Sequence, residues 1–164
     1  MTRSIERLLE DTARRGSWYG GGSAAALACA LAGALLEKLL NRSPSTRAVR
    51  AIRLRAAAFV DEDATAFSRV IKAYYQHDQS AARAALRTAT KIPLGVHASA
   101  GQLLRIARQQ KRTISARYQS DLTCVVTLAT AARKSARALV LTNLSWLNDP
   151  AYSRRARQQL SRAA

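Results

Sequence analysis

Three neighbouring carboxylates, Asp61, Glu62 and Asp63, are the residues best suited to chemistry in a 164-residue chain with only 10 Asp and Glu against 27 Lys and Arg. At about 100° of rotation per residue, Asp63 falls on one helical stripe with Phe59 and Val70, a stripe that favours the core. A carboxylate among apolar side chains loses hydration, and its pKa rises unless it is paired. Asp63 is therefore the first candidate for a group that takes up and releases a proton near neutrality.

Asp61 points to the opposite side of the same predicted helix. The alternative explanation for the whole acidic triplet is electrostatic, because ion-pair networks are common and three cations stand nearby. These cations are Arg53, Arg55 and Arg69. Spacing alone leaves both interpretations open.

A second candidate feature is the run of three glycines, Gly20, Gly21 and Gly22, followed by Ser23. Such a run predicts a loop whose bare backbone approaches a ligand and presents N–H groups at the start of the next helix. Trp18 and Tyr19 stand just before it and offer flat stacking surfaces. The alternative for these two aromatic residues is that they pack the first loop against the rest of the protein.

A third set of polar residues lies in the predicted helix over 117–147. Asp121 and Asn143 share one stripe with apolar residues such as Val125 and Ala132, which predicts that both polar groups face the core. Arg133, Lys134 and Arg137 fall on the opposite face.

The elements that must position these residues are helices. The composition is rich in Ala and Arg and poor in Gly and Pro, and no segment alternates as a strand does. Predicted helices cover 2–15, 23–41, 46–76, 78–90, 93–111, 117–147 and 150–160, with boundaries at His77-Asp78, Pro93 and Asp149-Pro150. The fold class is all-α: a single domain over residues 1–164, folded as an up-and-down bundle of about five to seven helices, two of them long.

The net charge of +17 predicts attraction to polyanions such as nucleic acid, an anionic membrane or a multiply charged ligand. A nucleic-acid partner is possible but not favoured, because the cations are spread over every predicted helix without an Arg-rich arm or a basic-aromatic motif. A compositional bias toward Ala and Arg is the alternative source of the charge.

Compartment and metal binding are predicted from the remaining features. Cys29 and Cys124 lie far apart in predicted helices and match no metal spacing, so we expect no metal site and a reducing compartment. The first ten residues lack the apolar segment of a signal peptide, and the most apolar window, 24–36, is too short to span a bilayer. We therefore expect a cytoplasmic protein without a membrane partner.

Four segments in this order resemble the cyclodeaminase/cyclohydrolase family, which comprises the C-terminal domain of formiminotransferase-cyclodeaminase and the bacterial methenyltetrahydrofolate cyclohydrolases. The segments span most of the chain. They are Gly20-Gly21-Gly22-Ser23-Ala24-Ala25-Ala26-Leu27, Asp61-Glu62-Asp63-Ala64-Thr65-Ala66-Phe67, Ile92-Pro93-Leu94, and Ser120-Asp121-Leu122 followed by Asn143-Leu144.

The resemblance implies an all-helical homodimer that acts on a tetrahydrofolate derivative without a metal or a tightly bound cofactor. It implies acid/base roles for Asp63 or Asp61, and a role for Asp121 in binding the pterin or holding a reacting water. It also implies that the ligand is lined by Gly20, Gly21, Gly22 and Ser23. We add Trp18, Tyr19, Ser120 and Asn143 to the candidate binding residues.

The chain departs from the family pattern at Ser17-Trp18-Tyr19, where Pro-x-Pro is usual, and at Ser115 and Arg117, where asparagines are common. Three hypotheses follow. The first is a folate cyclohydrolase or cyclodeaminase, in which buried carboxylates serve the proton transfers at an amidinium carbon. The second applies iminium or ring-forming chemistry to a non-folate heteroaromatic substrate. The third is a non-catalytic basic module that binds RNA or a protein partner.

Overall fold

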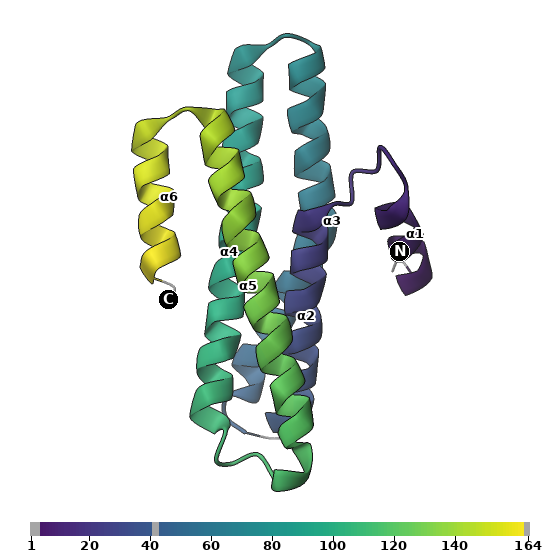
Figure 1. Cartoon of the computed structure of the whole chain (residues 1–164), viewed down its shortest axis with the longest axis vertical. Helices are drawn as coiled ribbons and strands as arrows, with labels where there is room; N and C mark the ends of the chain where they lie inside the picture. Colours follow the sequence, from purple (N-terminus) through teal and green to yellow (C-terminus); the bar gives the residue numbers. More distant parts are fainter. Residues whose placement is uncertain (1–3, 41–42, 163–164) are drawn as a thin grey trace.

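The computed structural model describes residues 4–40 and 43–162, and this part of the chain forms an all-helical bundle (Figure 1). The helices are α1 (Ile5–Ala13), α2 (Gly21–Leu40), α3 (Thr46–Tyr75), α4 (Gln79–Gln110), the short 3₁₀ helix η1 (Ala116–Tyr118), α5 (Gln119–Leu147) and α6 (Pro150–Arg162). Figure 1 shows α2 to α5 running along the long axis, with α1 and α6 on opposite flanks. The all-α class is confirmed, but three helices rather than two have 29 residues or more.

Helix α2 lies at the centre and packs against α3, α4 and α5. Its Ala26, Cys29, Ala32 and Leu36 are fully buried, and its small residues let the neighbouring helices approach closely. Among the described helices, α2 alone is long and apolar enough to cross a membrane, with a mean hydropathy of 1.6, yet half of that window is buried inside the bundle. Burial of this kind is typical of the central helix of a bundle.

Helix α4 corrects the prediction of a boundary at Pro93. The helix runs without a break from Gln79 to Gln110, with Pro93 buried inside it. Proline in a helix interior removes one backbone hydrogen bond and crowds the preceding turn, at a cost of about 3 kcal/mol or more. The apolar stripe through Ala89, Pro93, Val96 and Ala100 is buried on both sides of the proline, and we attribute the continuity of the helix to this packing.

The predicted caps of two helices are confirmed. The Asp78 side chain accepts a hydrogen bond of 2.9 Å from the Ala81 N–H at the start of α4. The Asp149 Oδ1 accepts one of 3.0 Å from the Tyr152 N–H at the start of α6. Both bonds satisfy N–H groups that a helix leaves without an internal partner.

Candidate active site

The site begins where the first turn of α2 meets the middle of α3. The structure starts α2 at Gly21, so Gly21 and Gly22 belong to the helix rather than to the predicted loop. The Asp63 side chain lies directly against Gly22. A Cβ atom built on Gly22 would stand 2.1 Å from Asp63 Oδ1 and 2.4 Å from Oδ2, far inside any normal contact. Glycine is required here because the carboxyl group occupies the space that a side chain would fill.

Ser23 adds polar contacts to Asp63 from the same turn. Its hydroxyl donates to the Val60 carbonyl at 2.8 Å and lies 3.3 Å from Asp63 Oδ2, and its backbone N–H also donates to the Asp63 carboxyl. Because a hydroxyl carries one proton, it serves Asp63 only when it turns away from Val60. The contacts with Ser23 thus fix the position of the Asp63 carboxyl, but they only partly stabilise its ionised form.

Burial is the main influence on the proton affinity of Asp63. It raises the pKa of the Asp63 carboxyl above the ordinary value, and the two hydrogen bonds from Ser23 lower it less than burial raises it. The positive end of α2 points at the same carboxyl and favours its ionised form. Asp63 therefore has a raised proton affinity, as expected of a group that takes up and releases a proton during a reaction.

A cavity of about 190 Å³ opens beside Asp63, between the first turn of α2 and helices α3, α4 and α5. Asn143 and Trp146 line it from α5, and Trp18 lines it from the loop before α2. The Trp18 ring also meets the Phe67 ring edge to face, with centroids 6.3 Å apart. The cavity thus combines one partly buried carboxyl, one amide and flat aromatic walls, which suits a planar heterocycle.

The interior proline of α4 also contributes to this cavity. Pro93 and Ala89 both line it. Because Pro93 has no N–H, the Ala89 carbonyl one turn earlier lacks its helical hydrogen bond. The α4 wall of the cavity therefore contains one backbone carbonyl without its usual helical donor.

Asp61 and Tyr19 lie outside the cavity. The Tyr19 hydroxyl donates to Asp61 Oδ1 at 2.7 Å, and Asp61 is exposed. Asp61 lines a different hollow, which it shares with Arg55 and Glu62, and these two form an ion pair. The electrostatic interpretation of the acidic triplet therefore holds for Glu62, whereas Asp63 alone faces the cavity.

The prediction that Asp121 faces the core is wrong. Its side chain is 34% exposed and pairs with Lys38 Nζ at 3.2 Å. Lys38 follows Gly21 by 17 residues in α2, which places Asp121 about 25 Å along the bundle from the cavity. Ser120 is exposed at the same distant end. The apolar stripe of α5 does reach its first turn, where Leu122 is buried, and Val125 one turn later is fully buried. Asp121 stands at the edge of that stripe, and its ion pair with Lys38 keeps the carboxylate at the surface.

The structure therefore brings some of the predicted site residues together at one cavity. Trp18, Gly20, Gly21, Gly22, Asp63 and Asn143 line the cavity, and Ser23 holds Asp63 from behind. Sequence reasoning missed Trp146, although it follows Asn143 by three residues and so shares its helical face. It also missed the part that Pro93 plays in the wall. Among residues 4–40 and 43–162, no three His, Cys, Asp or Glu side chains gather as metal ligands do.

Comparisons with known proteins place this geometry in a family. The fold matches the crystal structure of formiminotetrahydrofolate cyclodeaminase from Thermotoga maritima with a TM-score of 0.91, at 22% sequence identity, over 98% of this chain and 88% of that one. A search of curated proteins finds no match. The formiminotransferase-cyclodeaminase family matches residues 4–162, and the chain therefore belongs to the formiminotransferase-cyclodeaminase family.

Proposed function

We propose that this protein interconverts 5,10-methenyltetrahydrofolate with 10-formyl- or 5-formiminotetrahydrofolate, with Asp63 as the acid/base group. The observation that carries the proposal is the partly buried Asp63 carboxyl against Gly22, facing a cavity with aromatic walls. Membership of the family supports a folate one-carbon enzyme, and the residues around Asp63 suit the proton transfers of both reactions.

In the hydrolytic direction, water adds to the amidinium carbon of the methenyl group, and the Asp63 carboxylate accepts the proton that the water loses. The bond from that carbon to N5 then breaks, and the protonated Asp63 returns a proton to N5. One proton is released overall. The ionised carboxylate also stabilises the cationic methenyl group before water adds.

In the cyclodeaminase direction, N10 attacks the carbon of the protonated formimino group, whose nitrogen becomes a neutral NH2, and N10 loses its proton to Asp63. The carboxylic acid then protonates the formimino nitrogen, which leaves as ammonia as the methenyl cation forms. A single carboxyl that changes protonation state within the site serves both steps, which is why a raised pKa matters.

The size of the cavity limits how the substrate lies. A volume of about 190 Å³ is below the ~300–1,000 Å³ of pockets that enclose a whole drug-sized ligand. We infer that a ring-sized part of the folate enters beside Asp63, with the Asn143 amide and the free Ala89 carbonyl as polar partners. The rest of the molecule then lies along the surface.

The test is the decay of the methenyl chromophore, followed by ultraviolet absorbance with purified protein. Asp63→Asn should reduce kcat/KM by about 100- to 10,000-fold, the usual contribution of a positioned acid/base group. Asp61→Asn is the matched control, because it removes a carboxylate two residues away that lies outside the cavity, and it should retain activity within about threefold. Equal losses in both variants, or none in Asp63→Asn, would refute the assignment.

A second candidate keeps Asp63 but replaces folate with another heteroaromatic substrate. Trp18 favours it, because this residue lines the cavity within a segment where the family usually has Pro-x-Pro. Tight binding of methenyltetrahydrofolate without turnover, together with wild-type stability, would support this candidate over the first.

Location and assembly belong to the same proposal. We infer a cytoplasmic homodimer, as the family resemblance implies. Helix α1 supports assembly because none of its residues is buried, and its Ile5 and Leu9 are 69% and 59% exposed. Sedimentation analysis should give about twice the mass of one chain, whereas a monomer at micromolar concentration would contradict the inference.

A further inference from the structure

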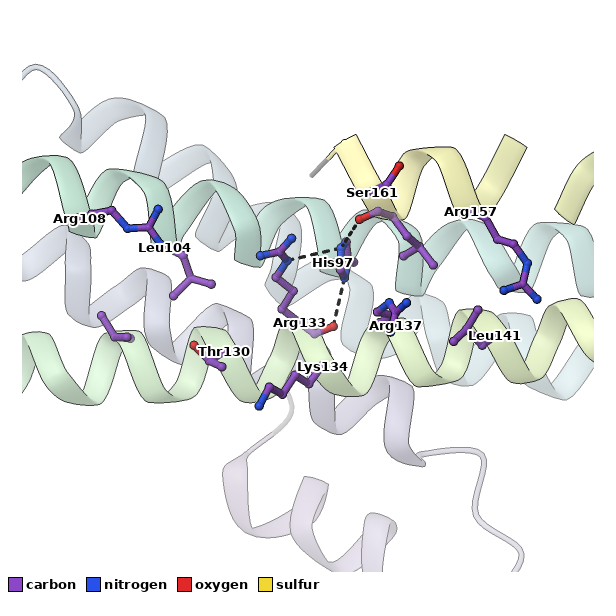
Figure 2. A pocket seen from close by; sticks show the side chains of 12 residues that line it. His97, Leu104, Arg108, Thr130, Arg133, Lys134, Arg137, Leu141, Arg157 and Ser161 are labelled. Carbon is purple, nitrogen blue, oxygen red and sulfur yellow. Dashed lines mark hydrogen bonds between the residues drawn. The ribbon is translucent and has the colours of Figure 1, made fainter. Parts of the chain in front are cut away.

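A larger hollow lies apart from the cavity at Asp63. It is a groove of about 620 Å³ between α4, α5 and α6, shown in Figure 2. Three leucines form part of its apolar lining, namely Leu104, Leu141 and Leu160. Five cationic side chains line it as well, and these are Arg108, Arg133, Lys134, Arg137 and Arg157. The combination of an apolar lining and several cations of one sign is typical of a site for an organic anion.

No carboxylate neutralises these five cations in the described part of the chain. Each ion pair found within residues 4–40 and 43–162 involves other basic residues. Helices α4 and α6 contain no Asp or Glu, and the single acid of α5, Asp121, pairs with Lys38. Clustered charges of one sign repel each other and attract anions, so the groove concentrates a positive field that the protein itself does not cancel.

His97 lines the groove where α4, α5 and α6 meet. The ring belongs to α4, is 3% exposed, and contacts the Arg133 carbonyl of α5 through Nδ1 at 3.1 Å and the Leu160 carbonyl of α6 through Nε2 at 3.2 Å. The Arg133 Nε lies 3.4 Å from the same ring, as the dashed lines in Figure 2 show. The neutral ring carries one N–H and donates to one of these two carbonyls at a time, which links α4 to α5 or to α6 beside the groove.

The groove and the cavity lie on opposite faces of α5. At about 100° per residue, Thr130 and Arg137 in the groove are roughly 180° from Leu139 and Trp146 in the cavity. A folate seated beside Asp63 cannot fill both. We therefore treat the groove as a separate candidate binding site.

The identity of the cations narrows the chemistry of that ligand. Four of the five are arginines, whose planar guanidinium groups bind two phosphate oxygens at once. Figure 2 shows Arg157 descending from α6 toward α5 at the end of the groove where Arg137 and Leu141 lie. Among the described residues, no aromatic side chain lines the groove, so this part of the chain offers none of the platforms on which single-stranded nucleic acids stack their bases. We propose that the groove binds a small organic polyphosphate of nucleotide size, with its phosphates on the arginines and its apolar part on the leucines.

The test measures binding of ATP, tripolyphosphate, inorganic phosphate and tetraglutamate to the full chain by calorimetry at about 0.15 M salt, without folate. ATP should bind more tightly than tripolyphosphate, because it adds apolar contact at similar charge, and both should bind at least tenfold more tightly than inorganic phosphate. At 100 times the dissociation constant, ATP should raise the Tm by about 5–10 °C.

The decisive variant is Arg137→Gln/Arg157→Gln, which should weaken ATP binding at least tenfold. Its matched control is Arg47→Gln/Arg50→Gln, which removes the same charge from two exposed positions of α3 outside the groove, and it should change binding less than twofold. Equal weakening in both variants would show attraction to net charge alone and overturn the proposal. Tetraglutamate binding as tightly as ATP, or a single-stranded oligonucleotide that ATP does not displace, would overturn it too.

Discussion

Replacing Gly22 by alanine should separate the position of the Asp63 carboxyl from the stability of the fold. A Cβ atom on Gly22 would stand 2.1 Å from Asp63 Oδ1, whereas ordinary contacts begin at 3.4 Å, so the carboxyl must retreat by more than 1 Å. A displacement of about 1 Å at a reacting group costs roughly 100-fold in rate, or about 2.7 kcal/mol of transition-state stabilisation. We expect Gly22→Ala to lower kcat by about that factor.

The fold should tolerate the same change. The clash involves the end of a side chain rather than backbone, and alanine favours a helix over glycine by up to about 1 kcal/mol. The two effects oppose each other, so we expect the Tm to stay within about 4 °C of the wild-type value. Thermal unfolding by circular dichroism measures this directly, alongside methenyltetrahydrofolate turnover.

Gly21→Ala is the control that makes the result interpretable. It places the same methyl group one residue earlier in the same helical turn, where the nearest atom is Leu139 Cδ2 at an ordinary 3.7 Å. Activity should fall less than threefold. If Gly22→Ala matches Gly21→Ala in both activity and Tm, the contact between Asp63 and the first turn of α2 has no catalytic importance, and the reasoning fails.

Three further predictions concern stability and reactivity. Burial raises the pKa of Asp63 in the folded state, so its contribution to stability is complete below the ordinary aspartate pKa and is lost as the pH rises through the raised value. Asp63→Asn should therefore unfold at a higher temperature than wild type at pH 7, and the difference should shrink toward pH 4. An equal difference at both pH values would contradict this. Gly95→Ala should lower the free energy of unfolding in urea by about 1–3 kcal/mol, because the new Cβ would stand 2.4 Å from Phe59 Cζ. An unchanged urea midpoint would show that the Phe59 ring moves aside freely. Burial raises the pKa of the Cys29 thiol to about 12, whereas Cys124 is exposed. A thiol reagent at pH 8 should therefore label one cysteine in the native protein and none in Cys124→Ser. Rapid labelling of that variant would refute the burial of Cys29.

The sequence was sufficient to predict the fold class and the central carboxylate. Helical periodicity separated Asp63 from Asp61, and the structure confirms that Asp63 faces inward between α2 and α3 while Asp61 does not. Periodicity succeeded there because the middle of α3 is packed along its whole inner stripe. The same argument failed for Asp121, because its ion pair with Lys38 keeps the carboxylate at the surface although Leu122 and Val125 are buried.

Pro93 and the glycines show a second limit. Local propensity predicted a helix boundary at Pro93 and a loop through Gly22, yet both residues lie inside helices. Tertiary packing outweighs propensity at both places, and both then line the cavity. The site is thus built in part by residues with poor helix propensity that lie inside helices. Pro93 leaves a backbone carbonyl without its helical donor, and Gly22 leaves space for the Asp63 carboxyl.

The distribution of charge follows from the two faces of α5. One face carries Leu139, Asn143 and Trp146 toward the Asp63 cavity, whereas the other carries Arg133 and Arg137 into the groove. The pKa of the Asp63 carboxyl is raised by burial and lowered by hydrogen bonds from Ser23, and both influences lie on the cavity side of the bundle. Saturating ATP in the groove should therefore leave the acidic limb of the pH–rate profile unchanged, and a shift of that limb to higher pH in the presence of bound ATP would show that the two faces are electrostatically coupled.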